Sequence, residues 1–363
     1  MIDSDLASNL TPRKAPTREA PTHARKQISR LKYCLILVVL PLIVIPAFIA
    51  LGRSDYFLHH GASVWVQAND QVFDARDRDC EVLVYGDSTA MTGIDPQRVE
   101  EQTGLRTCNI AVTNAVMAVT GNLTLDAFLA HNHRPQVLLI QLAPDGFQPE
   151  STIWHKTIYA EGLLELLRHG RPGEARRVLL THPAEAMSFA GYAAGFTAWF
   201  GIKEAWFHAT HLRPEEDTVV VQNGFFTPPA PAQTHCDAAT FRVASGTPDQ
   251  IGFARSLVKS FRSTYADRVG TVLVNVAPIP DCDDNLAAYT AGLNGITSNQ
   301  LRPMPVGYFN NCCHYTARGS AIVSTLVAQE VNSATGNSLR VGQTVAPTRQ
   351  IASLRRVRLR VRR

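Results

Sequence analysis

The chain has 363 residues, 45% of them hydrophobic, which is enough for the core of one large or two ordinary domains and excludes a disordered protein. The net charge of +4 is unevenly placed, because residues 1–32 carry +4 and residues 349–363 carry seven Arg and no acid, so the remainder carries −7. An acidic body argues against a nucleic-acid-binding fold, and we expect no nucleic-acid partner.

The N-terminal part of the chain divides into a basic leader and an apolar segment. Residues 1–32 have no apolar period and are typical of a disordered cytoplasmic leader. Residues 34–51 carry no charge, and as a helix they would span roughly 27 Å, close to the thickness of a bilayer core. We therefore predict a single transmembrane anchor over 33–52, in the inner or cytoplasmic membrane. The preceding basic residues keep the N-terminus cytoplasmic, so the rest is exported to the periplasm or beyond. A cleaved signal peptide is the alternative.

Export would place six of the seven cysteines in an oxidising compartment, where disulfides persist. Cys80 and Cys108 each lie at the start of a predicted strand, and neighbouring parallel strands bring their starts together. We expect a bridge between these two, while the pairing of the others stays open. The spacing of Cys312, Cys313 and His314 does not match a zinc site.

Short apolar runs alternate with amphipathic helices after the anchor. Strands are predicted at 81–86, 107–112 and 136–143, with a fourth at 269–278 after a long interval. Between and after them we expect helices at 96–103, 115–131, 248–267 and 316–331. Near-continuous apolar strands separated by helices predict an α/β fold with a parallel sheet covered on both faces.

The long interval, residues 148–247, is a predicted insertion with helices at 159–168 and 173–181. Its uncharged stretch 186–202 is interpreted as a lid or interfacial helix. A second membrane crossing there would separate strands of one sheet, and we exclude it. The main domain is then 53–335.

A basic tail follows over residues 336–363, in which Arg alternates with apolar residues near the end. It fits either an extended strand with one basic face or a solvated disordered tail. Its natural partners on the exported side are anionic head groups or an acidic polysaccharide.

A candidate nucleophile follows the first strand. Gly86-Asp87-Ser88 places a hydroxyl at the carboxyl edge of the predicted sheet, where open α/β folds collect their active sites. A serine nucleophile needs a base within hydrogen-bond reach and a third group that orients the base. His314, at the start of the last predicted helix, is the candidate base. Asp87 either caps the helix after the first strand or takes part in the chemistry.

Gly86-Asp87-Ser88 and the sequence HYTARGS that begins at His314 resemble the SGNH/GDSL hydrolase superfamily. Closer still are its membrane-anchored, exported members that act in O-acetylation or deacetylation of bacterial surface polysaccharides. The resemblance covers 80–145 and 250–332. It implies a three-layer, flavodoxin-like α/β/α sandwich with Ser88 as the nucleophile and His314 as general base and then acid.

The third catalytic group departs from the family pattern. The family places an Asp three residues before the His, where this chain has Asn311. An amide can accept a hydrogen bond from the imidazole but lacks the charge that stabilises imidazolium. One alternative is a Ser-His dyad with help from the backbone. Another is that Asp281, Asp283 or Asp284 reaches the site from the loop after the fourth strand.

The oxyanion-binding positions also differ. The family uses the Ser backbone N–H, a Gly after the second strand and an Asn after the third. This chain has Thr113 and Asn114 at the second position and Asp145 at the third. A carboxylate donates no hydrogen bond unless it is protonated, and loss of one donor costs roughly 10² to 10³ in rate.

Two hypotheses follow. The first is a membrane-anchored serine esterase or O-acyltransferase that acts on acyl groups, acetyl being the expected one, of a cell-envelope or secreted polysaccharide. Its partners would be the acylated glycan and a membrane-embedded acyl donor, and no metal or organic cofactor is implied. The second is a catalytically inactive SGNH-like scaffold that binds polysaccharide or a partner in a synthesis or export complex.

Overall fold

The structure is a computed structural model with two compact units, Met1–Ile43 and Val44–Arg363. Besides residues 54, 58, 199, 202–203, 206 and 209–210, the described residues form seven ranges: 30–52, 63–73, 75–148, 158–181, 221–236, 248–311 and 313–336. The predicted leader, apart from its last three residues, and the predicted tail, apart from its first, lie outside these residues. So does the uncharged stretch 186–202, except for residues 199 and 202.

Helix α1 (Arg30–Gly52) covers the segment predicted as an anchor. A search of the described residues finds no helix that is long and apolar enough to cross a membrane. All other elements of the structure belong to the second unit.

Four parallel strands form the centre of the second unit, in the order β2-β1-β3-β4. They are β1 (Val82–Gly86), β2 (Thr107–Asn109), β3 (Val137–Leu142) and β4 (Thr271–Val276). The predicted parallel α/β sheet is therefore confirmed. Strand β2 is shorter than expected, although Ile110 and Val112 beyond it still donate backbone hydrogen bonds to Val84 and Gly86 of β1.

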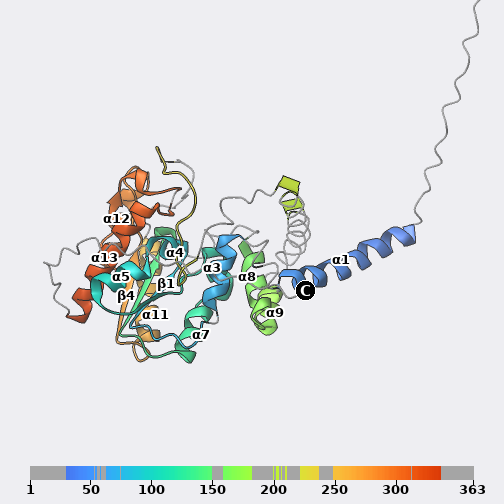
Figure 1. Cartoon of the computed structure of the whole chain (residues 1–363), viewed down its shortest axis with the longest axis horizontal. Coiled ribbons are helices and arrows are strands. Elements are labelled where there is room, and N and C mark those ends of the chain that lie inside the picture. Colours follow the sequence, from blue (N-terminus) through green and yellow to red (C-terminus); the bar gives the residue numbers. More distant parts are fainter. Residues whose placement is uncertain are drawn as a thin grey trace, which may run out of the picture. The chain divides into compact units, whose positions relative to one another are not determined.

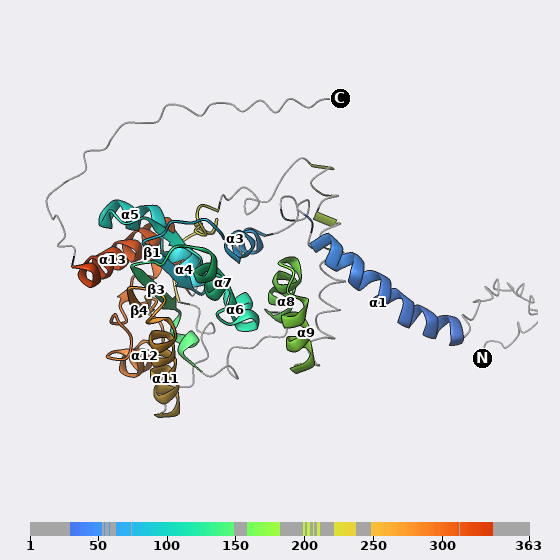
Figure 2. The same ribbon diagram turned by 90° about the horizontal axis from the view of Figure 1, so that it is seen from below.

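Helices cover both faces of the sheet, as α5 and α13 on one side and α11 on the other show (Figures 1 and 2). One face packs on α4 (Ser88–Gly93), α5 (Pro96–Thr103) and α13 (Ala317–Thr335). The opposite face packs on α6 (Asn114–Thr120), α7 (Leu123–His131), α8 (Ile158–Arg168), α11 (Pro248–Tyr265) and α12 (Leu286–Leu293). Successive residues of β1 and β3 are buried alternately in the two cores. Both faces of these strands are therefore apolar, and the strands appear in the sequence as continuous apolar runs.

The predicted helices agree with the structure except in four places. The predicted helix 115–131 is two helices, because Gly121 between α6 and α7 takes a positive φ of 56°. Helix α3 (Val64–Phe73), helix α4 and helix α12 were not predicted. In the insertion, α8 and α9 (Pro172–Thr181) lie where helices were expected.

Short 3-10 helices and strands lie near the carboxyl edge of the sheet. A 3-10 helix, η1 (Pro144–Phe147), follows β3, and a second one, η4 (Val306–Tyr308), precedes the loop that carries His314. The strands β5 (Ile279–Pro280) and β6 (Pro303–Met304) pair in parallel beside them.

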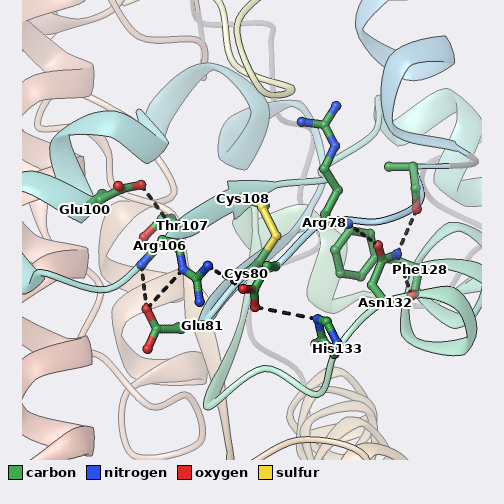
Figure 3. The surroundings of a disulfide bond; sticks show 12 residues. Arg78, Cys80, Glu81, Glu100, Arg106, Thr107, Cys108, Phe128, Asn132 and His133 are labelled. Atoms are coloured by element: carbon green, nitrogen blue, oxygen red, sulfur yellow. Dashed lines mark hydrogen bonds and ion pairs between the residues drawn. A yellow bond between two sulfur atoms is a disulfide. The ribbon is translucent and has the colours of Figure 1, made fainter.

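The expected disulfide between Cys80 and Cys108 is present and joins the start of β1 to β2 (Figure 3). Arg106 pairs with Glu81 and Asp79 beside it. A second disulfide, Cys236–Cys282, was not predicted as a pair. Cys312 lies outside the described residues.

Loss of the Cys80–Cys108 bridge should destabilise the fold. The bridge closes a loop of 28 residues, so in the chain-entropy description its removal costs about 3–4 kcal/mol. We expect the Cys80→Ala/Cys108→Ala variant to lose that amount in the free energy of unfolding, measured in urea without reductant. The control is Cys34→Ala, at an exposed position of α1, which should leave this free energy unchanged.

Candidate active site

Ser88 is the first residue of α4, directly after the turn that ends β1. The turn requires glycine at position 86, since a Cβ there would lie 1.9 Å from the carbonyl oxygen of Gln141 on β3. Ser88 is half-buried, and its backbone N–H has no hydrogen-bond partner among the described residues. The hydroxyl therefore stands at the carboxyl edge of the sheet, as predicted.

The buried carboxylate of Asp87 fixes this turn. Its Oδ1 accepts hydrogen bonds from the Thr89 backbone N–H (2.9 Å) and hydroxyl (2.6 Å). Its Oδ2 accepts from the Ala143 backbone N–H at 2.7 Å, just beyond β3. Burial raises the pKa of Asp87, although these hydrogen bonds act in the opposite direction. Both oxygens are occupied, so Asp87 is the cap of α4 and not a substrate-binding group.

His314 reaches Ser88 from the far end of the sequence. Its Nε2 lies 2.9 Å from Ser88 Oγ, although the two residues are 226 positions apart. The loop before α13 is held by an antiparallel bridge between Phe309 and Tyr315, both fully buried. The Tyr315 hydroxyl also donates to the carbonyl oxygen of Pro278 at 2.8 Å. The ring of His314 is thus fixed through its neighbour in sequence.

The imidazole of His314 is shielded from solvent. The ring of Trp65, on α3, lies 4.6 Å from it between centroids, and Phe226 packs edge-on against Trp65. This desolvation lowers the pKa of His314 from 6.5 to about 4. The imidazole is therefore neutral at pH 7, which a general base requires.

Asn311 occupies the position of the orienting group, and it selects one tautomer. Its Oδ1 accepts the backbone N–H groups of Cys313 (3.1 Å) and His314 (2.8 Å). Because two donors point at the oxygen, the amide nitrogen is the end that faces the ring, 2.7 Å from His314 Nδ1. A nitrogen donor there requires an unprotonated Nδ1, so the neutral ring carries its proton on Nε2 and donates it to Ser88 Oγ. A general base needs the opposite tautomer.

None of the three alternative carboxylates replaces Asn311. Asp281 and Asp284 are exposed, and Asp283 Oδ1 accepts the backbone N–H of Asn285 at 2.7 Å. The expectation that one of them would orient the imidazole is not met, because Asp283 bonds to the backbone of its own loop and the other two side chains are exposed.

Thr113 and Asn114, the residues at the second oxyanion position, differ from each other in their hydrogen bonds. The Thr113 backbone N–H is donated to Asn69 Oδ1 at 2.8 Å, and its hydroxyl lies 3.1 Å from Asn69 Nδ2. Thr113 caps α6 and does not offer its N–H to a substrate. Asn114 follows as the first residue of α6, half-buried, and its side chain makes no hydrogen bond within the described residues.

Asp145 lies in η1, after β3. Burial, followed by the charge of Asp87, raises its pKa from 3.8 to about 7. Its Oδ1 is buried and has no hydrogen-bond partner among the described residues. A carboxyl with a pKa raised in this way offers its protonated form near neutral pH, and the protonated form is a hydrogen-bond donor.

Comparisons of the chain with protein-family models, curated proteins and solved structures found no match. The resemblance to SGNH hydrolases therefore rests on the sequence motifs alone. The sequence did not identify Trp65 or Asn69, which both lie on the unpredicted helix α3. The spacing of Val64, Ala68 and Val72 along one helix face was the available signal.

The tautomer of His314 can be tested directly. We expect long-range ¹H–¹⁵N NMR spectra at pH 7 to show a neutral ring protonated on Nε2, with a pKa near 4. Asn311→Asp should move the proton to Nδ1 and raise the pKa, because a carboxylate accepts from Nδ1 and stabilises the charged form. His133, an exposed histidine, serves as the control and should be unchanged. A wild-type ring protonated on Nδ1 would contradict the orientation of Asn311.

Proposed function

We propose that this chain is an SGNH-like serine esterase or O-acyltransferase that acts on acyl groups, acetyl being the expected one, of a cell-envelope or secreted polysaccharide. The observation that carries the proposal is the 2.9 Å contact between Ser88 Oγ and His314 Nε2 at the carboxyl edge of a parallel sheet. The strand order β2-β1-β3-β4 also supports a flavodoxin-like arrangement, which starts with the same four strands.

In the proposed reaction, Ser88 Oγ attacks the ester carbonyl while His314 Nε2 takes its proton. The tetrahedral intermediate then expels the sugar oxygen, which receives that proton, and an acyl-serine remains. Water or a second sugar hydroxyl attacks the acyl-serine, with His314 again moving the proton. Each half of the cycle moves one acyl group and one proton, so no cofactor is consumed.

Two groups are proposed to bind the oxyanion. The Ser88 backbone N–H is the first, since it has no partner among the described residues. Protonated Asp145 is the second, because its raised pKa makes the donor form available at neutral pH. The Asn114 side chain, which makes no hydrogen bond in the described part of the chain, is a further candidate.

Asn311 is proposed to limit the rate. The reaction needs the proton on Nδ1, whereas the amide nitrogen of Asn311 stabilises the ring with its proton on Nε2. In a serine protease the change from Asp to Asn at this point costs about 10⁴ in turnover for the same reason. The same observation favours the second candidate function, a scaffold that binds polysaccharide or a partner without catalysis.

The proposed location is the exported face of the cytoplasmic membrane, with residues 33–52 as the anchor and a membrane-embedded acyl donor as the partner. Its support is the uncharged sequence 34–51 behind basic residues. Two disulfides in the second unit are also typical of an oxidising compartment.

Fluorophosphonate labelling separates the two candidate functions. An esterase should be labelled at Ser88, and both Ser88→Ala and His314→Ala should abolish labelling. Asn311→Asp should raise the labelling rate by roughly 10² to 10⁴, because it supplies the productive tautomer. Asn310→Asp adds the same charge one residue away and is the matched control, expected to give no gain. If neither the folded wild type nor Asn311→Asp reacts, the scaffold is the better conclusion.

The labelling rate should depend on pH in two steps. It should rise as pH increases through about 4, where His314 becomes neutral, and fall through about 7, where Asp145 loses its donor proton. Asp145→Asn replaces the carboxyl by a permanent donor, so the fall near pH 7 should disappear while the rise near 4 remains. A fall that persists in this variant would exclude Asp145 from oxyanion binding.

A further inference from the structure

A second cluster of titratable side chains lies between α3 and α8, separate from Ser88 and His314. Asp70 belongs to α3, Glu165 and Arg168 belong to α8, and His169 follows α8 directly. The two helices pack against each other and lie side by side in Figures 1 and 2. One donor atom from each of Asp70, Glu165 and His169 lies within 4.8 Å of the other two.

The distances in this cluster suit a metal ion better than direct hydrogen bonds. His169 Nε2 lies 3.3 Å from Asp70 Oδ1 and 3.5 Å from Glu165 Oε2. Charge-assisted hydrogen bonds from a nitrogen to a carboxylate are shorter, about 2.7–2.9 Å. A tetrahedral ion with bonds of about 2.0–2.2 Å instead separates its ligand atoms by roughly 3.3–3.6 Å. Both measured separations fall in that range.

Glu165 provides independent support for a ligand at this place. Its residue is 1% exposed, yet its Oε2 accepts no hydrogen bond within the described residues and is aimed at the imidazole of His169. A buried carboxylate oxygen without a hydrogen bond is costly even when the other oxygen of the group is paired, and a cation bound at Oε2 would remove that cost.

The surroundings also hold the three donors in place. Arg168 Nη1 donates to Glu165 Oε1 at 2.7 Å, which leaves Oε2 as the oxygen directed at the cluster. The ring of Phe73, on α3, stacks on the imidazole at 4.5 Å between centroids and 15° between planes. Hydrogen bonds and packing of this kind orient the ligands of metal sites in general.

We propose that Asp70 Oδ1, Glu165 Oε2 and His169 Nε2 form a binding site for one divalent transition-metal ion of the zinc type, which joins α3 to α8. One imidazole nitrogen and two carboxylate oxygens are donors that zinc accepts, and three protein ligands leave a fourth position for water. Arg168, whose Nη1 is 3.6 Å from Asp70 Oδ1, reduces the net negative charge. We therefore expect weaker binding than at four-ligand structural sites.

A proton on His169 is the competitor of the metal ion. Burial alone would lower the pKa of His169, but the negative charges of Glu165 and Asp70 beside it outweigh burial and raise the pKa to about 9. Without metal, an imidazolium neutralises the two carboxylates together with Arg168.

The site would act on the helix that borders the candidate active site. Helix α3 places Trp65 against His314 and Asn69 against Thr113, and Asp70 is the next residue. An ion that fixes α3 to α8 would hold these contacts. The metal site itself does not depend on the proposed esterase function, because its ligands do not touch Ser88 or His314.

The test is a zinc titration of the untagged full chain after chelator treatment, followed by isothermal calorimetry and by thermal unfolding. We expect one equivalent of Zn²⁺ to bind and to raise the melting temperature. Glu165→Gln and His169→Gln should both lose this binding event. His133→Gln removes an exposed histidine beside Asp79 and should retain it.

Asp70→Asn is the second variant, since Asp70 is the most exposed of the three ligands and its loss threatens folding least. It should weaken zinc binding at least tenfold while the circular dichroism spectrum stays that of the wild type. Absence of zinc binding by folded, metal-free wild type would overturn the proposal. So would binding that is unchanged in Asp70→Asn and His169→Gln.

Discussion

The carboxylate of Asp87 connects the three elements on which the candidate site is built. It caps α4, follows the last residue of β1, and accepts the backbone N–H of Ala143 after β3. Buried carboxylates are stable only when both oxygens are satisfied, and here three donors satisfy them. This constraint sets the direction in which α4 leaves the sheet, and with it the position of the Ser88 hydroxyl.

The proposed chemistry of Ser88 and His314 depends on the orientation of the Asn311 side-chain amide. Asn311 presents its oxygen to two backbone N–H groups, and so it must present its nitrogen to His314. A carboxylate could satisfy the backbone with one oxygen and accept from Nδ1 with the other. The difference between Asp and Asn is therefore larger here than the loss of a charge, because it also selects the tautomer of the base.

Helix α3 relates the candidate active site to the rest of the second unit. Within six residues it contributes an aromatic ring at His314, an amide at Thr113 and a carboxylate at the cluster with α8. Its apolar residues Val64 and Ala68 are buried in one core and Val72 in the other. A displacement of α3 would therefore disturb its contacts with His314, with Thr113 and with the cluster on α8 at the same time. Because α8 packs on α3, the insertion that carries α8 affects the candidate active site.

The sequence by itself determined the strands, most of the helices, the bridge between Cys80 and Cys108, and the choice of Ser88 and His314. These follow from local signals, since continuous apolar runs, helical periods and turn glycines act over a few residues. Only the tertiary structure decided the 2.9 Å contact between Ser88 and His314, the end of Asn311 that faces the ring, and the hydrogen bond that holds Asp283 to its own loop. It also decided the cluster of Asp70, Glu165 and His169. Some of these contacts join residues that are far apart in sequence, and others depend on which backbone donors surround a side chain. A local sequence pattern predicts neither kind of contact.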